Sequence, residues 1–329
     1  MRTRVSMQLS NSKLATPGGS DKLVSMNTKE SIIECVPNFS EGTNVAAVRE
    51  IVHAMQVDGV SLLDYSLDPD HNRSVVTLAG APGPIMESVL RGVGKSTELI
   101  NMTAQHGVHP RIGAADVVPL VPIRNISLPE CAALAHQLGQ EIWKRHHVPV
   151  YFYEAAALRP DRRLLENIRN GQFEGLRKKV QQDAASRPDV GGPSLHPTAG
   201  AVAVGARQLL IACNVFLSTG NVGVARSVAR DIRAASGGLD GLKAMGVLVS
   251  GKAQVSMNIT DFHATPVSKV YQAVKDAAAQ LGAQPDRVEL IGLVPEAAVE
   301  PGSEWMQLAT NFSVARTLES RLETPMIWP

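Results

Sequence analysis

The feature that most constrains the fold is an order of apolar segments that occurs twice along the 329 residues. Alternating or short continuous apolar runs indicate strands, and apolar residues three to four positions apart indicate helices. In the first half, a strand, a helix, two strands, a helix and a strand are predicted at 32–36, 45–55, 60–64, 74–79, 85–102 and 117–121. In the second half, the same order is predicted at 208–217, 222–235, 246–249, 253–259, 266–281 and 288–293.

This order is that of the ferredoxin-like, or split βαβ, arrangement. We therefore expect an α/β (α+β) protein with two ferredoxin-like βαββαβ subdomains, each an antiparallel sheet backed by helices, and a crevice between them. The first subdomain should occupy 31–206 and the second 207–300. A polar, disordered extension is expected at 1–30, with Met26 as a possible true start, and a loose helical tail at 301–329.

The segment that follows the first repeat predicts further elements. A helix is expected at 128–146, because Ser127 can cap it and Glu130, three residues later, completes a capping box. A strand at 149–153, short helices at 159–180 and a Gly- and Pro-rich loop at 188–200 should follow.

Composition excludes several classes of function. The formal net charge is +1 and aromatic residues make up 4%, so the chain lacks the basic field and the stacking rings of a nucleic-acid-binding protein. It contains no run of 18 or more apolar residues, so no membrane span is expected. Cys35, Cys131 and Cys213 lie in apolar segments without metal-type spacing, which predicts buried free thiols in a reducing compartment. We expect a cytoplasmic protein, since the N-terminus also lacks the apolar core of a signal peptide.

Chemically usable groups gather in the turn at 105–119. Pro110 disfavours a helical backbone at His109, so the imidazole should be displayed on a non-helical turn. A histidine titrates near ~6.5 and can therefore exchange a proton at neutral pH, although a structural histidine fits the same pattern. Arg111 either binds a substrate carboxylate or pairs with Asp116 to fix the turn.

A second polar cluster lies at the end of a predicted strand. Asp68, His71, Asn72 and Arg73 form either a plain loop or a substrate site that holds the ammonium and carboxylate groups of an amino acid. A calcium loop is excluded, because Arg73 stands where such a loop needs glycine and Ala79 where it needs glutamate. We expect no metal site.

Several separated motifs carry a family resemblance. The chain reads HGVHPRIGAADVVP from His106 to Pro119, CVPNFSEG from Cys35 to Gly42, and LIGLVP from Leu290 to Pro295. Together with Asn72-Arg73 and the loop at 188–200, these motifs resemble the formiminotransferase family, the folate-dependent glutamate formiminotransferases. The likeness extends over about residues 31 to 295.

The resemblance implies transfer of the formimino group of N-formimino-L-glutamate to tetrahydrofolate, a late step of histidine degradation. The products would be 5-formiminotetrahydrofolate and L-glutamate, tetrahydrofolate being a co-substrate and no metal being required. His109 matches the family's catalytic histidine and would act as general acid and base. The crevice between the subdomains would then be a folate crevice.

The resemblance also implies that the Gly-rich loop contacts folate, with exposed backbone groups that can pair with a flat pterin. The alternative is that the loop is only an interdomain linker. The loop residues concerned are Gly191, Gly192, Pro193, Ser194, Leu195, His196, Pro197, Thr198, Ala199 and Gly200.

The chain departs from the family in two places. Val108 stands where the family commonly has a glutamate before the catalytic histidine, which leaves formyl transfer between 5-formyltetrahydrofolate and glutamate as an alternative reaction. A non-catalytic folate-binding module is a further alternative. Animal members of the family continue into a cyclodeaminase domain, so we expect a separate cyclodeaminase to act downstream here. The family also predicts a homodimer.

Overall fold

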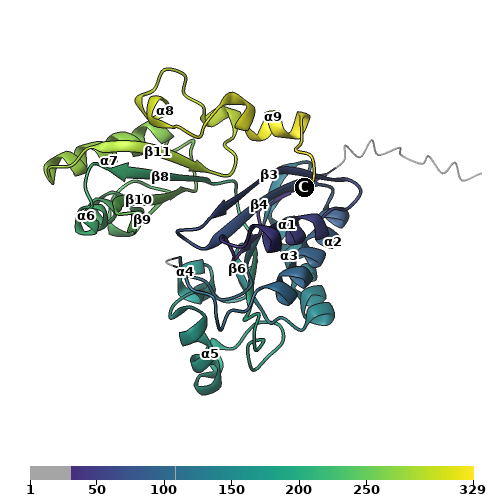
Figure 1. The fold of residues 1–329 in the computed structure, drawn as a ribbon. Helices are drawn as coiled ribbons and strands as arrows, with labels where there is room; N and C mark the ends of the chain where they lie inside the picture. The colour runs from purple at the N-terminus through teal and green to yellow at the C-terminus, as the bar shows by residue number, and fades with distance from the viewer. Residues whose placement is uncertain (1–30, 108) are drawn as a thin grey trace, which may run out of the picture.

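The computed structural model of this chain describes residues 31–107 and 109–329. The predicted disordered extension at 1–30, with the possible start at Met26, and the departure at Val108 lie outside the described residues. Two sheets, each backed by helices, lie side by side and form two subdomains (Figure 1). The predicted pair of α/β subdomains is confirmed.

The first subdomain contains the predicted strand–helix–strand–strand–helix–strand order, with an unpredicted two-residue strand after the first, and then continues into further elements. Its elements are β1 (Ile32–Cys35), β2 (Asn38–Phe39), α1 (Val45–Ala54), β3 (Val60–Asp68), β4 (Arg73–Gly80), α2 (Pro82–Leu99), β5 (Ala115–Arg124), α3 (Leu128–His146), β6 (Val150–Glu154), α4 (Leu165–Ile168), α5 (Gln172–Gln182) and β7 (Val202–Ala206). Short 3₁₀ helices lie at Pro160–Arg162 and Ala184–Ser186. The predicted capping box at α3 is present, with the side chains of Ser127 and Glu130 each accepting from the other's backbone N–H.

The sheet of the first subdomain is mixed, whereas the sequence predicted an antiparallel one. Its strand order is β1-β4-β2-β5-β7-β6, with β3 pairing β4 on the outside. The pairs β5–β7 and β6–β7 are parallel, and the pairs that β1, β2 and β3 form are antiparallel. Parallel pairing is possible because α3 and the long segment before β7 provide the crossover connections that parallel strands need. The strand β7 was not predicted from the sequence.

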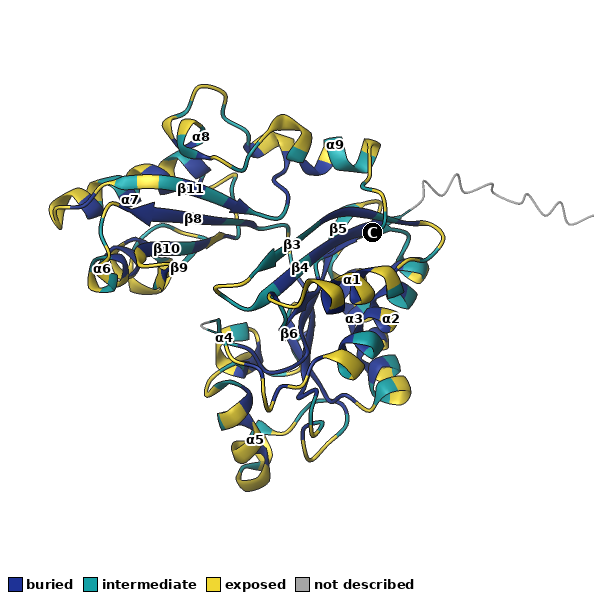
Figure 2. Ribbon diagram, in the orientation of Figure 1, coloured by how far each residue is buried: buried dark blue, intermediate teal, exposed yellow. Residues whose placement is uncertain are grey.

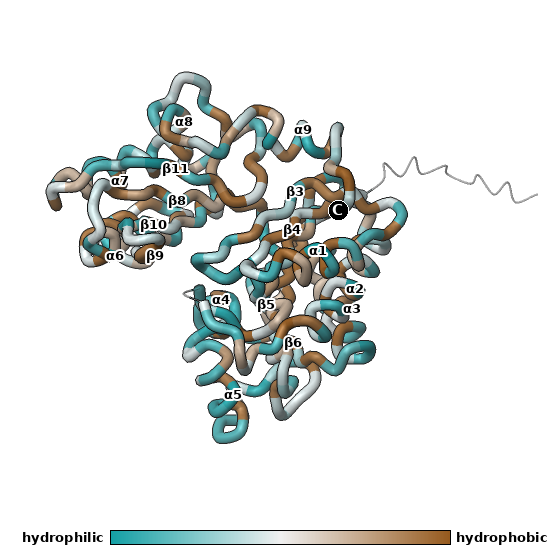
Figure 3. The backbone as a smooth tube through the Cα atoms, in the orientation of Figure 1, coloured by the Kyte–Doolittle hydropathy of each residue, from teal (hydrophilic) through white to brown (hydrophobic). Residues whose placement is uncertain are grey.

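The helices α1, α2 and α3 cover one face of this sheet (Figure 1). In α1, the residues Val48, Ile51 and Val52 are buried and lie on one face, since they are three to four positions apart. Burial is deepest along the strands, and the exposed positions follow the outer sides of the helices (Figure 2). Figure 3 shows the same division in hydropathy, with hydrophobic strands and largely hydrophilic α4 and α5.

The second subdomain has the predicted element order. It consists of β8 (Ile211–Leu217), α6 (Val222–Ile232), β9 (Leu242–Val249), β10 (Lys252–Ile259), α7 (Val267–Gln280) and β11 (Pro285–Ile291), with 3₁₀ turns at Ala234–Ser236 and, after the sheet, Glu296–Ala298. The strand order is β11-β8-β10-β9 and every pair is antiparallel. Cys213, Val215 and Leu217 of β8 pack into one buried cluster with residues of α6 and α7.

The C-terminal segment is packed, although the sequence predicted a loose tail. It forms α8 (Glu304–Leu308), a 3₁₀ turn (Val314–Arg316) and α9 (Leu318–Glu323), and runs from the second subdomain back to the first (Figure 1). Trp305 is fully buried in the core of the second subdomain. Leu318 packs with Leu63 of β3, and the N–H of Met326 donates to the carbonyl of Leu62 at 2.8 Å. This segment therefore connects the two subdomains.

Two predictions from composition can be compared with the described residues. Among them, no helix combines the length and the hydrophobicity that crossing a bilayer requires. Cys35, Cys131 and Cys213 are buried free thiols, as predicted. Burial raises the pKa of the Cys131 thiol to about 11.

Candidate active site

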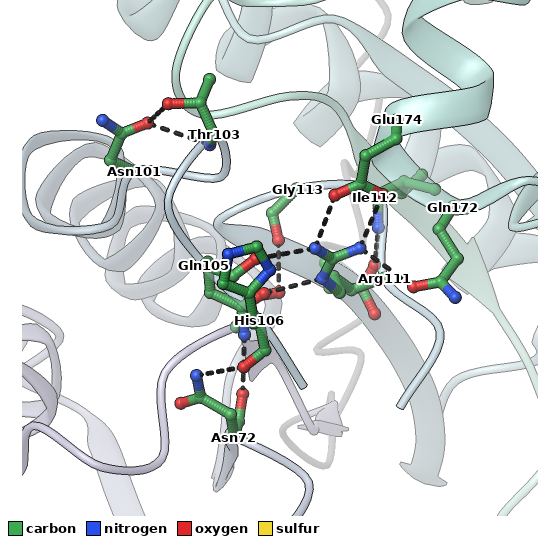
Figure 4. A network of polar contacts seen from close by, with 12 residues as sticks. Asn72, Asn101, Thr103, Gln105, His106, Arg111, Ile112, Gly113, Gln172 and Glu174 are labelled. Carbon is green, nitrogen blue, oxygen red and sulfur yellow. Dashed lines mark hydrogen bonds and ion pairs between the residues drawn. The ribbon is translucent and has the colours of Figure 1, made fainter. Parts of the chain in front are cut away.

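The two predicted polar clusters meet in the folded chain. The amide of Asn72 donates to the carbonyl of His106 at 2.7 Å, and the amide of Gln105 donates to the carbonyl of Asn72 at 3.1 Å (Figure 4). These bonds hold the turn between β3 and β4 against the segment that carries His109. The structure thus brings together residues that are more than thirty positions apart.

A small pocket lies between these segments. Its volume is about 10 Å³, roughly the space that one water molecule takes. A substrate can therefore reach the polar groups that line the pocket only if some of the lining side chains move. The pocket is lined by Phe39, Ser40, His71, Asn72, Arg73, His109, Arg111 and Asp116.

His109 lies on a non-helical turn, as predicted, but its imidazole is half-buried instead of exposed. Its Nδ1 is 2.8 Å from the carbonyl oxygen of Pro110, and its Nε2 accepts a hydrogen bond from Nη1 of Arg73. A carbonyl can only accept and a guanidinium can only donate, so Nδ1 carries the proton and the ring is neutral. Burial, followed by the charges of Arg73 and Arg169, holds the pKa of His109 far below its ordinary value.

Arg73 is a half-buried cation at the start of β4. Its Nε is buried without a hydrogen-bond partner, and within the described residues it forms no ion pair with a carboxylate. Burial, followed by the charge of Arg169, lowers the pKa of Arg73 to about 10. An arginine in these surroundings is suited to bind an anion.

Arg169 is close enough for its charge to lower the pKa of His109, and it was not identified from the sequence. It caps the C-terminus of α4, and its Nη2 donates to Oδ2 of Asp116. The Nε of Arg169 is buried and lacks a hydrogen-bond partner. The arginines in the predicted short helices at 159–180 were the available signal, but nothing in their spacing distinguishes this one from its neighbours.

Arg111 does not pair with Asp116, which corrects one of its two predicted roles. Its guanidinium donates to the side chain and carbonyl of Gln105 at 2.7 and 2.8 Å, to Gln172 at 2.9 Å, and to both carboxylate oxygens of Glu174 at 3.0 and 2.8 Å (Figure 4). These five bonds equal the five N–H donors of a guanidinium. Arg111 therefore fixes the turn, and its predicted role in substrate binding would require that a substrate displace Glu174.

Asp116 fixes the backbone of the same turn. Its Oδ1 accepts from the N–H of Ile112 at 2.7 Å, while Oδ2 accepts from Arg169. Gly113 lies so close to the segment before β7 that a Cβ atom would be 2.0 Å from the carbonyl oxygen of Ala201. Only glycine allows this close approach.

Asp68 and His71 form a hydrogen-bonded pair in the turn between β3 and β4. Oδ2 of Asp68 is 2.6 Å from Nδ1 of His71, and Oδ1 accepts from the backbone N–H of His71 at 2.9 Å. Burial raises the pKa of Asp68, but the hydrogen bonds from His71 outweigh this effect, so the pKa is lowered overall. The rings of His71 and His109 lie edge to face, with centroids 6.2 Å apart.

The Gly-rich loop belongs to the first subdomain. The carbonyl of Thr198 accepts from Met102 N–H at 2.8 Å, and that of Ala199 accepts from Ala114 N–H at 2.9 Å, which places the end of the loop beside the turn that follows His109. The loop leads into β7 of the first sheet, so the interdomain-linker interpretation is wrong. The chain instead passes from the first subdomain to the second through the short segment 207–210.

The second subdomain approaches the first along β9. Nζ of Lys243 lies 3.4 Å from Oε1 of Glu154 and 3.3 Å from Oε1 of Glu166, three residues before Arg169. At the other end of β9, the hydroxyl of Ser250 donates to Asp70 at 2.8 Å, in the turn between β3 and β4. The pocket therefore lies on the side of the first subdomain that faces β9. Among the described residues, no group of three or more His, Cys, Asp or Glu side chains could hold a metal ion.

Comparisons with known proteins agree over nearly the whole described chain. Residues 32–207 match the N-terminal subdomain of the formiminotransferase domain, and residues 212–321 match the formiminotransferase domain. The glutamate formimidoyltransferase of Streptococcus pyogenes serotype M1 is 41% identical over 284 residues, which cover 85% of this chain and 95% of that protein. The glutamate formimidoyltransferase of Thermoplasma acidophilum is 39% identical over 298 residues, covering 89% and 98%.

A longer relative matches the same part of the chain. The formimidoyltransferase-cyclodeaminase of Gallus gallus is 38% identical over 283 residues, which cover 83% of this chain and 52% of that protein. Two family matches in succession, together with relatives matched over almost their entire length, lead to one conclusion. The chain belongs to the formiminotransferase family.

Proposed function

We propose that this chain is a glutamate formimidoyltransferase, an enzyme that transfers the formimino group of N-formimino-L-glutamate to tetrahydrofolate. The observation that carries this proposal is the match to two proteins of that name over 95% and 98% of their lengths. The products are 5-formiminotetrahydrofolate and L-glutamate. A non-catalytic folate-binding module is disfavoured, because these relatives are named as transferases.

The reaction needs one proton to change position. N5 of tetrahydrofolate attacks the formimino carbon and forms a C–N bond, and the bond from that carbon to the glutamate nitrogen then breaks. The proton lost from N5 has to reach the leaving nitrogen. We assign this transfer to His109, whose neutral imidazole has a lone pair on Nε2, the nitrogen that Arg73 contacts.

Other predicted residues are assigned by the same proposal. Arg73, whose Nε is buried without a partner and which forms no ion pair with a carboxylate among the described residues, would bind a carboxylate of the amino-acid substrate. Asp68, His71 and Asn72 would shape this side of the pocket. The loop 191–200 would contact folate, and its position beside the Gly113 turn is compatible with this role.

The wider setting is also part of the proposal. We infer that the protein is a cytoplasmic homodimer that acts in one-carbon and histidine metabolism. A cyclodeaminase would act on the product, since the name of the Gallus gallus relative joins the two activities.

The test is a transferase assay with purified protein, tetrahydrofolate and N-formimino-L-glutamate. Acid converts the product to 5,10-methenyltetrahydrofolate, which absorbs in the near ultraviolet. Wild type should give signal, and His109→Ala should lose ~10²- to 10⁴-fold in rate while still binding folate. His53→Ala, at an exposed position of α1, is the matched control and should retain activity. Activity with a formyl donor in place of the formimino donor would shift the assignment to formyl transfer.

A further inference from the structure

In the described structure, Nε2 of His109 is occupied by a cation. A base must offer a lone pair to a proton, but here that lone pair accepts a hydrogen bond from Nη1 of Arg73. The pocket around the two residues has room for about one water molecule, so substrate cannot enter beside them without displacing a side chain. His109 is therefore not ready to act as a base in this arrangement.

The charges around His109 are unbalanced. Arg73 and Arg169 each carry a positive charge, and Asp116 supplies one negative charge, through its contact with Arg169. Asp68 is already engaged by His71 in a pair 2.6 Å apart. The charge of Arg169 lowers the pKa of Arg73, and the more distant carboxylates of Asp116 and Asp68 offset this only in part, since Arg73 forms no ion pair with either among the described residues. A buried N–H donor of a cation that lacks a partner is costly, and an incoming anion would compensate it.

The unused donors indicate where such an anion would bind. Nε of Arg73 and Nε of Arg169 are both buried without hydrogen-bond partners. The planar guanidinium group engages a carboxylate through two parallel N–H donors, typically Nε and one Nη. The charges of both guanidinium groups act on His109 and on each other, so their unpaired donors form a site for a carboxylate next to this histidine.

We propose that Arg73 and Arg169 together bind a carboxylate of the amino-acid substrate, and that this binding draws Arg73 away from Nε2 of His109. This inference rests on the proposed function, because it takes the amino-acid substrate as the ligand. Arg169 becomes a substrate-binding residue, and Arg73 has two roles: it blocks the base when the site is empty and binds substrate when the site is filled. The imidazole is free only when a substrate is in place.

The charged and titratable groups that face His109 come from different elements of the fold. Arg73 comes from β4, Arg169 from the end of α4, and His71 from the turn between β3 and β4; all three lower the pKa of His109. Asp116 of β5 partly offsets Arg169. A bound carboxylate adds negative charge near the ring and removes the hydrogen bond from Arg73, so both effects raise the pKa of His109.

The first experiment measures binding of L-glutamate by calorimetry, which does not depend on the transfer reaction. We expect Arg73→Met and Arg169→Met to weaken binding about 10- to 100-fold. Arg73→Lys and Arg169→Lys preserve the charge if a Met variant does not fold, and should still weaken binding because a lysine cannot engage a carboxylate through two parallel bonds. Arg91→Met, at a half-exposed position of α2, should bind as wild type does.

The second experiment follows the ring nitrogens of His109 by NMR in protein with labelled histidine, with His109→Gln to assign its signals. Saturating L-glutamate should raise the pKa of His109 in wild type. In Arg73→Met the pKa should already be raised without L-glutamate, and addition of the ligand should change it much less.

The outcomes separate this inference from the proposed function. Suppose that the wild-type protein catalyses the transfer and binds L-glutamate, and that the arginine variants bind L-glutamate with unchanged affinity. This result would overturn the carboxylate site and leave the proposed function standing. Binding that depends on both arginines but leaves the signals of His109 unchanged would overturn its release by substrate. A wild-type protein that shows neither transfer nor L-glutamate binding would overturn both proposals.

Discussion

Nη1 of Arg73 donates a hydrogen bond to Nε2 of His109, which lies 36 residues further along the chain. The contact determines the protonation state of the histidine, because it requires an unprotonated Nε2. It also positions the guanidinium of Arg73 beside the reacting groups of the proposed reaction.

The neutral state of His109 predicts a dependence of stability on pH. The pKa of His109 in the folded protein lies far below the ordinary value of 6.5, so below that pH the unfolded chain binds more protons at this site. The free energy of unfolding should therefore fall as the pH is lowered from 6.5, by at most ~1.4 kcal/mol per pH unit from this residue. Urea unfolding of wild type and His109→Gln between about pH 7.5 and pH 5 measures the difference. His53→Gln should keep the wild-type slope, and an equal slope in His109→Gln would contradict the prediction.

Arg111 should contribute to stability rather than to catalysis. Arg111→Met removes five hydrogen bonds and leaves Oε1 of the buried Gln105 without its donor, so we expect the free energy of unfolding to fall by about 1–3 kcal/mol. Glu174→Gln should cost less than ~1 kcal/mol, because the Glu174 side chain is 55% exposed. Chemical denaturation measures both changes. A large rise in KM for the amino-acid substrate in Arg111→Lys, without loss of stability, would instead support the role in substrate binding.

Gly113 should not tolerate a side chain. In Gly113→Ala the new Cβ would meet the carbonyl oxygen of Ala201 at 2.0 Å. Because both atoms belong to packed backbone segments, we expect the free energy of unfolding to fall by more than ~2 kcal/mol. Gly175→Ala is the matched control: its Cβ would meet nothing within 4 Å, and alanine should stabilise α5 by about 0.5–1 kcal/mol. Thermal unfolding of the two variants should therefore show changes of opposite sign.

The C-terminal segment should stabilise the first subdomain through Arg316. Its Nη2 is 3.1 Å from Oδ2 of Asp64, whose side chain is 10% exposed. Arg316→Met leaves this carboxylate buried without its cation and should cost about 1–3 kcal/mol. Asp64→Asn combined with Arg316→Met should cost less than the sum of the single changes, because the two residues interact directly. Strict additivity in this double-mutant cycle would show that the interaction between the two side chains contributes nothing to the free energy of unfolding.

Much of the architecture follows from local patterns. The order of strands and helices in both halves could be predicted because periodicity and capping, such as the box formed by Ser127 and Glu130, involve residues within one or two turns of each other. The turn around His109 was located from Pro110, whose ring restricts the residue before it. The parallel pairing of β7 was missed, because a short run of small apolar residues after a loop carries no local signal for its neighbours in the sheet.

The candidate site divides in the same way. The sequence by itself determined which residue types are available, and placed His109, Arg111, Arg73 and Asp68 in two polar turns. The tertiary structure alone decided that these turns meet, that Arg111 pairs with Glu174, 63 residues away, and that Arg169 reaches Asp116 across 53 residues. Such contacts depend on how β4, β5 and α4 pack in space, and the pKa of His109 depends on the burial and charges that this packing creates.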